Sequence, residues 1–102
     1  MKFFVGIGGY RLDLAHCRSL KDKRQTMKSV LDRLGNRRGM GASEVGENAL
    51  WKSGTIAVVC VSRSYGAAVE SLSSALRVIE SSGVEVLERE VQVISPEDLQ
   101  GG

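Results

Sequence analysis

The segment GTIAVVCVS at residues 54–62 constrains the fold most strongly, because a run of β-branched and small apolar residues is typical of a buried strand. Alternate side chains of a strand point to opposite faces. The two faces here carry Ile56, Val58 and Cys60 on one side, and Ala57, Val59 and Val61 on the other. Both faces are apolar, whereas a half-solvated sheet usually alternates apolar and polar residues. We therefore expect a sheet whose face away from the helices packs against a second subunit.

Three further segments have the pattern of strands, at residues 3–14, 40–45 and 84–94. In the first of them Tyr10, Leu12 and Leu14 alternate with Arg11 and Asp13, which predicts one buried face.

Two segments have apolar residues at helical spacing. The first follows Ser19, a good N-cap, and its predicted apolar stripe comprises Leu20, Met27, Val30, Leu31 and Leu34. The second spans residues 66–82, and its predicted stripe comprises Val69, Leu72, Leu76 and Ile79.

The order of these elements is β-α-β-β-α-β, and right-handed crossovers leave one arrangement that suits it. We predict an α+β fold, a ferredoxin-like sandwich with a four-stranded antiparallel sheet of order 4-1-3-2 and two helices on one face. The 102 residues are enough for one domain, with residues 95–102 as a flexible tail.

Charge is divided unevenly along the chain. Residues 1–40 hold ten Lys and Arg against three acids, a net charge of +7, whereas the remaining residues hold four against nine, a net charge of −5. This polarity indicates either an anionic partner for the basic half or two halves that attract each other. The apolar run at the start is too short for a signal peptide or a membrane span, so we expect a cytoplasmic protein with free cysteines and no membrane partner.

Positive charge is concentrated at the beginning of the first predicted helix, in Arg18, Lys21, Lys23, Arg24 and Lys28. A helix N-terminus already carries partial positive charge and free N–H groups, so cations there are unfavourable unless an anion binds. We therefore predict that these five cations bind phosphate groups, for example of RNA. The alternative is a solvated surface whose cations pair with acids of the second half, such as Glu44.

Other motifs do not predict catalysis. GIGGYR at Gly6–Arg11 lacks the third glycine of a dinucleotide loop and is followed by a strand. His16 and Cys17 are neighbours, which rarely face each other as a nucleophile and base must. Glu44 and Glu47 fit a charged hairpin end better than a pair of catalytic carboxylates. We expect no catalytic residue, no metal ion and no cofactor, because metal-ligand spacing is absent as well.

Trp51 is the single tryptophan of the chain and falls between the second and third predicted strands. We expect it to cover one end of the core, and the alternative is a stacking platform or an interface anchor.

Four short motifs give the chain a resemblance to the YlxP-like family of small bacterial proteins of unassigned function. They are SLKDKR at residues 19–24, LDRL at 31–34, SEVG at 43–46 and LW at 50–51. The resemblance implies a ferredoxin-like fold and no particular activity. Genes of that family often lie among those for translation initiation and ribosome maturation, which implies ribosomal RNA or the ribosome as a partner.

Three functions therefore compete. The first is a non-catalytic protein that associates with RNA or the ribosome through the basic helix. The second is a homodimeric interaction module without nucleic-acid binding. The third is an enzyme like acylphosphatase, with Arg18 as the anion-binding arginine, but Asn36 and Asn48 lie outside the third strand, where such an enzyme needs an asparagine.

Overall fold

The structure is a computed structural model, and it describes residues 1–46 and 52–100. The strands are β1 (Phe4–Asp13), β2 (Met40–Val45), β3 (Ser53–Ser62) and β4 (Glu85–Ile94). The helices are α1 (Leu20–Gly35), α2 (Tyr65–Ser81) and α3 (Pro96–Gln100). Each predicted strand and each of the two predicted helices is present, with bounds within two residues of those expected from the sequence.

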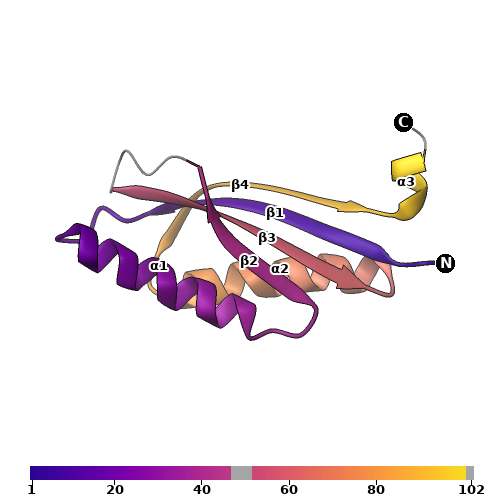
Figure 1. The fold of residues 1–102 in the computed structure, drawn as a ribbon, viewed down its shortest axis with the longest axis horizontal. Helices are drawn as coiled ribbons and strands as arrows, with labels where there is room; N and C mark the ends of the chain where they lie inside the picture. The colour runs from indigo at the N-terminus through magenta and orange to yellow at the C-terminus, as the bar shows by residue number, and fades with distance from the viewer. Residues whose placement is uncertain (47–51, 101–102) are drawn as a thin grey trace.

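The four strands form one antiparallel sheet in the order β2-β3-β1-β4. This is the predicted order 4-1-3-2 read from the other edge, and α1 and α2 lie on the same side of the sheet (Figure 1). The predicted α+β, ferredoxin-like sandwich is therefore confirmed.

The core lies between the helices and the two central strands. The predicted buried face of β1 is confirmed, because Tyr10, Leu12 and Leu14 are at most 1% exposed. In β3, Ile56, Val58 and Cys60 point toward the helices and are buried as well.

The helices present slightly different faces to the sheet than the sequence predicts. In α1, Met27, Val30 and Leu34 are buried as expected, but Leu20 in the first turn is 47% exposed. In α2, Val69 was predicted in the buried stripe and is 41% exposed. The sheet instead contacts a face that comprises Ala68, Leu72, Ala75 and Ile79. Small alanines let the helix approach the strands closely, which turns the bulkier Val69 toward the side.

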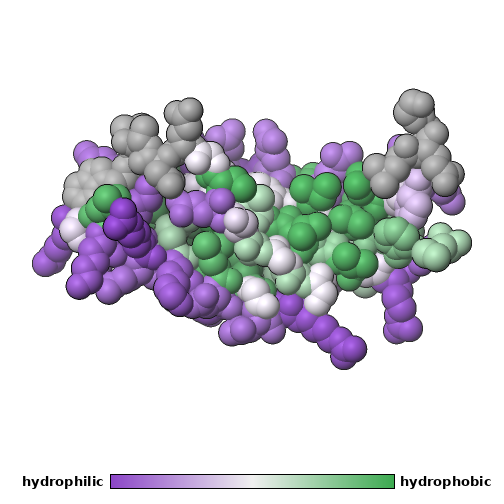
Figure 2. All heavy atoms as spheres, in the orientation of Figure 1, coloured by the Kyte–Doolittle hydropathy of each residue, from purple (hydrophilic) through white to green (hydrophobic). Residues whose placement is uncertain are grey.

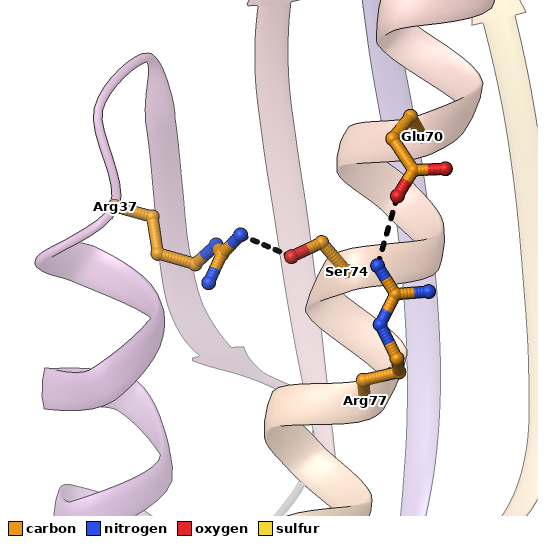
Figure 3. A network of polar contacts seen from close by, with 4 residues as sticks. All are labelled: Arg37, Glu70, Ser74 and Arg77. Carbon is orange, nitrogen blue, oxygen red and sulfur yellow. Dashed lines mark hydrogen bonds and ion pairs between the residues drawn. The ribbon is translucent and has the colours of Figure 1, made fainter.

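Two arginines at the end of α1 join it to α2. Arg33 donates hydrogen bonds to the hydroxyls of Ser81 and Ser82, at 2.8 and 2.5 Å. Arg37 donates to the hydroxyl of Ser74, while Arg77 pairs with Glu70 along the exposed side of α2 (Figure 3). The C-terminal end of α1 is thus fixed to α2 by polar contacts as well as by the core.

The short helix α3 lies within the segment that the sequence predicts to be a flexible tail. Its start is capped by Asp98, whose carboxylate accepts from the backbone N–H of Ser95 at 2.7 Å and from the Ser95 hydroxyl at 3.3 Å. Figure 1 shows α3 at the same end of the molecule as the N-terminus.

Glycines in β1 make room for the largest core side chain. A Cβ atom at Gly8 would lie 2.7 Å from the Cε2 and hydroxyl atoms of Tyr10, so the tyrosine ring occupies the space above this glycine. At Gly6, a Cβ atom would lie 2.6 Å from the sulfur of Cys60. The GIGGYR motif therefore serves close packing in a strand.

The same ring leaves one polar atom without a partner. The Tyr10 hydroxyl is buried and makes no hydrogen bond to any residue that the structure describes. Burial raises the pKa of Tyr10 above its ordinary value of 10.0, although the nearby positive charge of Arg89 acts in the opposite direction. Tyr10 is therefore a neutral phenol at physiological pH.

We expect Gly8→Ala to lower the free energy of unfolding by about 1–3 kcal/mol, because the new methyl group must displace the buried Tyr10 ring. Gly9→Ala is the matched control, since a Cβ atom there meets nothing within 4 Å on the opposite face of the same strand. Chemical denaturation followed by circular dichroism measures both. Equal stabilities of the two variants would contradict the close packing of Tyr10 on Gly8.

We expect Tyr10→Phe to raise the free energy of unfolding by about 1 kcal/mol, because it removes a buried hydroxyl that has no partner. The raised pKa adds a pH dependence: folding keeps the phenol neutral, so this contribution is complete below pH 10 and is lost as the pH rises through the folded pKa. Urea unfolding at neutral and alkaline pH should show a steeper alkaline decline in the parent than in the variant. Tyr65→Phe, at a residue that is 60% exposed, is the control and should change neither quantity.

Candidate nucleic-acid interface

The first turn of α1 has the cap that the sequence predicts. The hydroxyl of Ser19 accepts from the backbone N–H of Asp22 at 3.1 Å, and the Asp22 carboxylate accepts from the backbone N–H of Arg18 at 3.1 Å. Asp22 is the acidic residue of this turn and offsets part of the positive charge that accumulates there.

Four of the five predicted phosphate-binding cations lie on the surface. Arg18 precedes the helix, and Lys21, Arg24 and Lys28 follow at spacings of three and four residues, so the three share one exposed side of α1. Lys23 differs, because it is 3% exposed and belongs to the buried side with Met27. The exposed cation group therefore comprises Arg18, Lys21, Arg24 and Lys28.

Ion pairing accounts for little of this charge. The ammonium of Lys28 donates to the Asp32 carboxylate at 2.7 Å, and this hydrogen bond raises the pKa of Lys28. Arg18, Lys21 and Arg24 form no ion pair with the residues that the structure describes. Three cations at the start of α1 are thus available to an anion from outside the described chain.

The two oppositely charged halves are joined by one ion pair among the described residues, between Arg11 and Glu88 at 3.2 Å across β1 and β4. The pair between Arg77 and Glu70 lies within the acidic half. Among the described residues, attraction between the halves therefore provides no ion pair to Arg18, Lys21 or Arg24.

Of the acidic and acylphosphatase-like candidates, the structure describes Glu44, Arg18 and Asn36, and it does not bring Arg18 and Asn36 into one site. Glu44 lies on β2 beside a hollow that Lys23 and Arg24 also line. Arg18 and Asn36 flank opposite ends of α1, a helix about 24 Å long at about 1.5 Å per residue. Trp51, Glu47 and Asn48 lie outside the described residues, so the predictions for them remain predictions.

The side chains of His16 and Cys17, which the sequence predicts to be ordinary loop residues, lie close to each other. The Nε2 atom of His16 lies 3.9 Å from the Sγ atom of Cys17, in the loop between β1 and α1. The same sulfur lies 3.8 Å from the Thr26 hydroxyl, and Cys17 is 7% exposed. An activated nucleophile uses a separation of about 2.6–3.2 Å, so this contact is longer than such a pair requires.

A second surface is the open face of the sheet, away from α1 and α2. Its apolar residues are neighbours across β1 and β3, because Ile7 pairs with Val59 and Val5 pairs with Val61. Ile7, Val59 and Val61 are 44%, 45% and 59% exposed. Figure 2 shows hydrophobic residues gathered over the strands, next to the hydrophilic surface of α1. We call Val5, Ile7, Val59 and Val61 the open-face patch.

The contacts of Arg33 and Arg37 with α2 were not predicted from the sequence, because the serine hydroxyls that accept them follow no periodic pattern.

Among the described residues, no three His, Cys, Asp or Glu side chains converge as metal ligands would. Within the same residues, no helix has the length and apolar character needed to cross a membrane.

Solved structures of low sequence identity share the fold. A structural-genomics protein named YJCS is 10% identical with a TM-score of 0.53, over 86% of this chain and 96% of that protein. SnoaB, a cofactor-independent oxygenase from Streptomyces nogalater, is 11% identical with a TM-score of 0.48, over 89% of this chain and 90% of that one. A monooxygenase of antibiotic biosynthesis from Chloroflexus aurantiacus J-10-fl, so described provisionally, is 14% identical with a TM-score of 0.42, over 90% and 92%. At 10% identity, the similarity to the YJCS protein supports the fold alone.

A comparison with curated proteins gives no match. A family model does match, over residues 5–91, and its description is a protein of unknown function, DUF503. The narrower resemblance to YlxP-like proteins stays a prediction. Because the matched region includes β1 through most of β4, the chain belongs to the DUF503 family.

Proposed function

We propose that this protein is a non-catalytic RNA-binding module that associates with ribosomal RNA through the exposed cations at the start of α1. The observation that carries the proposal is the set of three cations, Arg18, Lys21 and Arg24, that have no ion-pair partner among the described residues. Phosphate groups would offset a charge arrangement that the helix N-terminus by itself disfavours.

The open sheet face offers RNA less than α1 does. Its strand positions hold no aromatic side chain for base stacking, and β4 contributes Glu88 and Glu90 to it, which repel phosphate. We therefore expect contacts to the RNA backbone, with affinity that depends strongly on salt and weakly on sequence.

The test uses two triple variants that remove the same charge. Arg18→Gln/Lys21→Gln/Arg24→Gln removes the proposed site, and Lys52→Gln/Arg63→Gln/Arg77→Gln removes three exposed cations elsewhere. We expect the first variant to lose affinity for a ribosomal RNA fragment and to lower the log–log salt slope by about 0.7–0.9 for each lost phosphate contact. The control should keep most of both quantities.

Filter binding or fluorescence anisotropy at several salt concentrations supplies the affinities, and thermal melts confirm that both variants fold. Equal losses in the two variants would mean that only net charge matters and would contradict a site at α1. Absence of RNA binding by the parent protein would end the proposal.

A second candidate function, self-association, is favoured by the open-face patch. Three large apolar side chains of the patch, each at least 44% exposed, adjoin the small residues Gly9 and Ala57. A flat apolar surface of this kind suits a second copy of the sheet packed face to face. Because α1 lies on the other side of the sheet, a homodimer of this kind leaves the cations accessible.

We expect Val59→Glu to convert a homodimer into a monomer, because it places a charge at the centre of the patch. Val69→Glu on α2 makes the same change at a valine of similar exposure, 41% against 45%, and should leave the mass unchanged. Light scattering at micromolar concentration measures all three proteins. A parent protein that has the mass of one chain throughout would refute self-association.

A further inference from the structure

A cavity lies between α2 and β4, on the helix side of the sheet and away from the α1 cations. Strand β4 is at the edge of the sheet, and α2 does not cover it fully, so Val91 is 54% exposed although it points to the helix side. The cavity has a volume of about 350 Å³, within the range of small-molecule sites. Its lining comprises Tyr10, Tyr65, Val69, Leu72, Ser73, Leu76, Arg89, Val91, Gln92 and Val93.

The wall of this cavity is mainly apolar because of the way α2 packs. Ala68 and Ala75 face the sheet, which turns Val69 and Leu76 toward β4. Val91 and Val93 complete the apolar wall from the strand. An apolar ligand body would cover side chains that water now contacts, which is the usual source of affinity in such sites.

Two polar residues, Tyr10 and Arg89, belong to the lining, and the positive charge of Arg89 acts on the Tyr10 hydroxyl. Tyr10 and Arg89 are directly paired across β1 and β4, so both side chains point to the helix side. The Tyr10 hydroxyl is buried and has no hydrogen-bond partner among the described residues. Arg89 forms no ion pair with those residues, and it is the one charged side chain of the lining they provide.

These groups define the chemistry of the missing partner. A neutral phenol donates one hydrogen bond, and a guanidinium donates several to a carboxylate. The hydroxyl is buried, so a head group reaches it only when a neighbouring side chain moves. Arg89 is exposed, and no ion pair with the described residues fixes its position. An acidic side chain in the lining would oppose an anion, and none is present among the described lining residues.

We propose that the cavity between α2 and β4 binds a small apolar organic acid, whose carboxylate pairs with Arg89 and accepts from the Tyr10 hydroxyl. The apolar body of the acid lies along Val69, Leu76 and Val91. This inference is independent of RNA binding, because the cavity and the exposed cation group share no residue.

The experiment titrates the isotope-labelled full chain with octanoate and, in parallel, with octanamide, which has the same shape without the charge. We expect saturable chemical-shift changes confined to α2, β4 and the Tyr10 ring, with octanoate bound about tenfold more tightly than octanamide through the ion pair. Arg89→Gln should abolish this difference. Tyr10→Phe should weaken binding of both probes, because each offers an oxygen to the hydroxyl.

Arg77→Gln is the matched control, since Arg77 is an exposed arginine of α2 outside the cavity lining. It should leave both affinities unchanged. Equal affinity for the two probes, shift changes centred on the open-face patch, or insensitivity to both Arg89→Gln and Tyr10→Phe would overturn the proposal. So would shift changes at the same residues on raising the protein concentration alone, which would mean that a second copy occupies the cavity.

Discussion

The packing of the Tyr10 ring over Gly8 is the contact on which the arrangement of the other elements depends. β1 pairs with both β3 and β4, so its helix side is the middle of the core. Because Gly6 and Gly8 lack side chains, that middle can hold a tyrosine ring lying along the strand and can still receive Leu72 of α2. The position of α2 follows, and with it the uncovered strip along β4.

The molecule then separates its chemistry onto distinct surfaces. Cations gather at the start of α1, the open-face patch is apolar, and the cavity between α2 and β4 combines an apolar wall with Arg89 and a buried phenol. The three surfaces lie on different elements or on opposite sides of the sheet. The anion, the second copy and the small molecule that we propose would therefore occupy separate surfaces of one small domain.

The sequence predicts the fold well because its strongest signals are local. Alternation around Leu12 and the run through Val58 identify strands, and Ser19 begins the first helix with the cap observed. The orientation of α2 was not predictable in the same way. A helical wheel favours the bulky Val69 as a core residue, whereas the sheet selects the small Ala68 because backbones approach more closely there.

The candidate sites depended on tertiary contacts and were predicted less well. Helical periodicity places both Lys23 and Arg24 beside the stripe of Met27, but it does not reveal that Lys23 is buried while Arg24 is exposed. No sequence pattern predicts the cavity between α2 and β4, because Tyr10 and Arg89 are 79 positions apart and become neighbours only through strand pairing. Likewise, the contact between the side chains of His16 and Cys17 depends on the geometry of the loop after β1.

The central place of β1 has a consequence for the order of events during synthesis. This strand is made before both of its neighbours, β3 and β4, and β4 ends at residue 94. Its ladders close over long stretches of chain, a topology that slows folding. The sheet thus reaches completion only after β4 has emerged, and until then one edge of β1 lacks its partner strand.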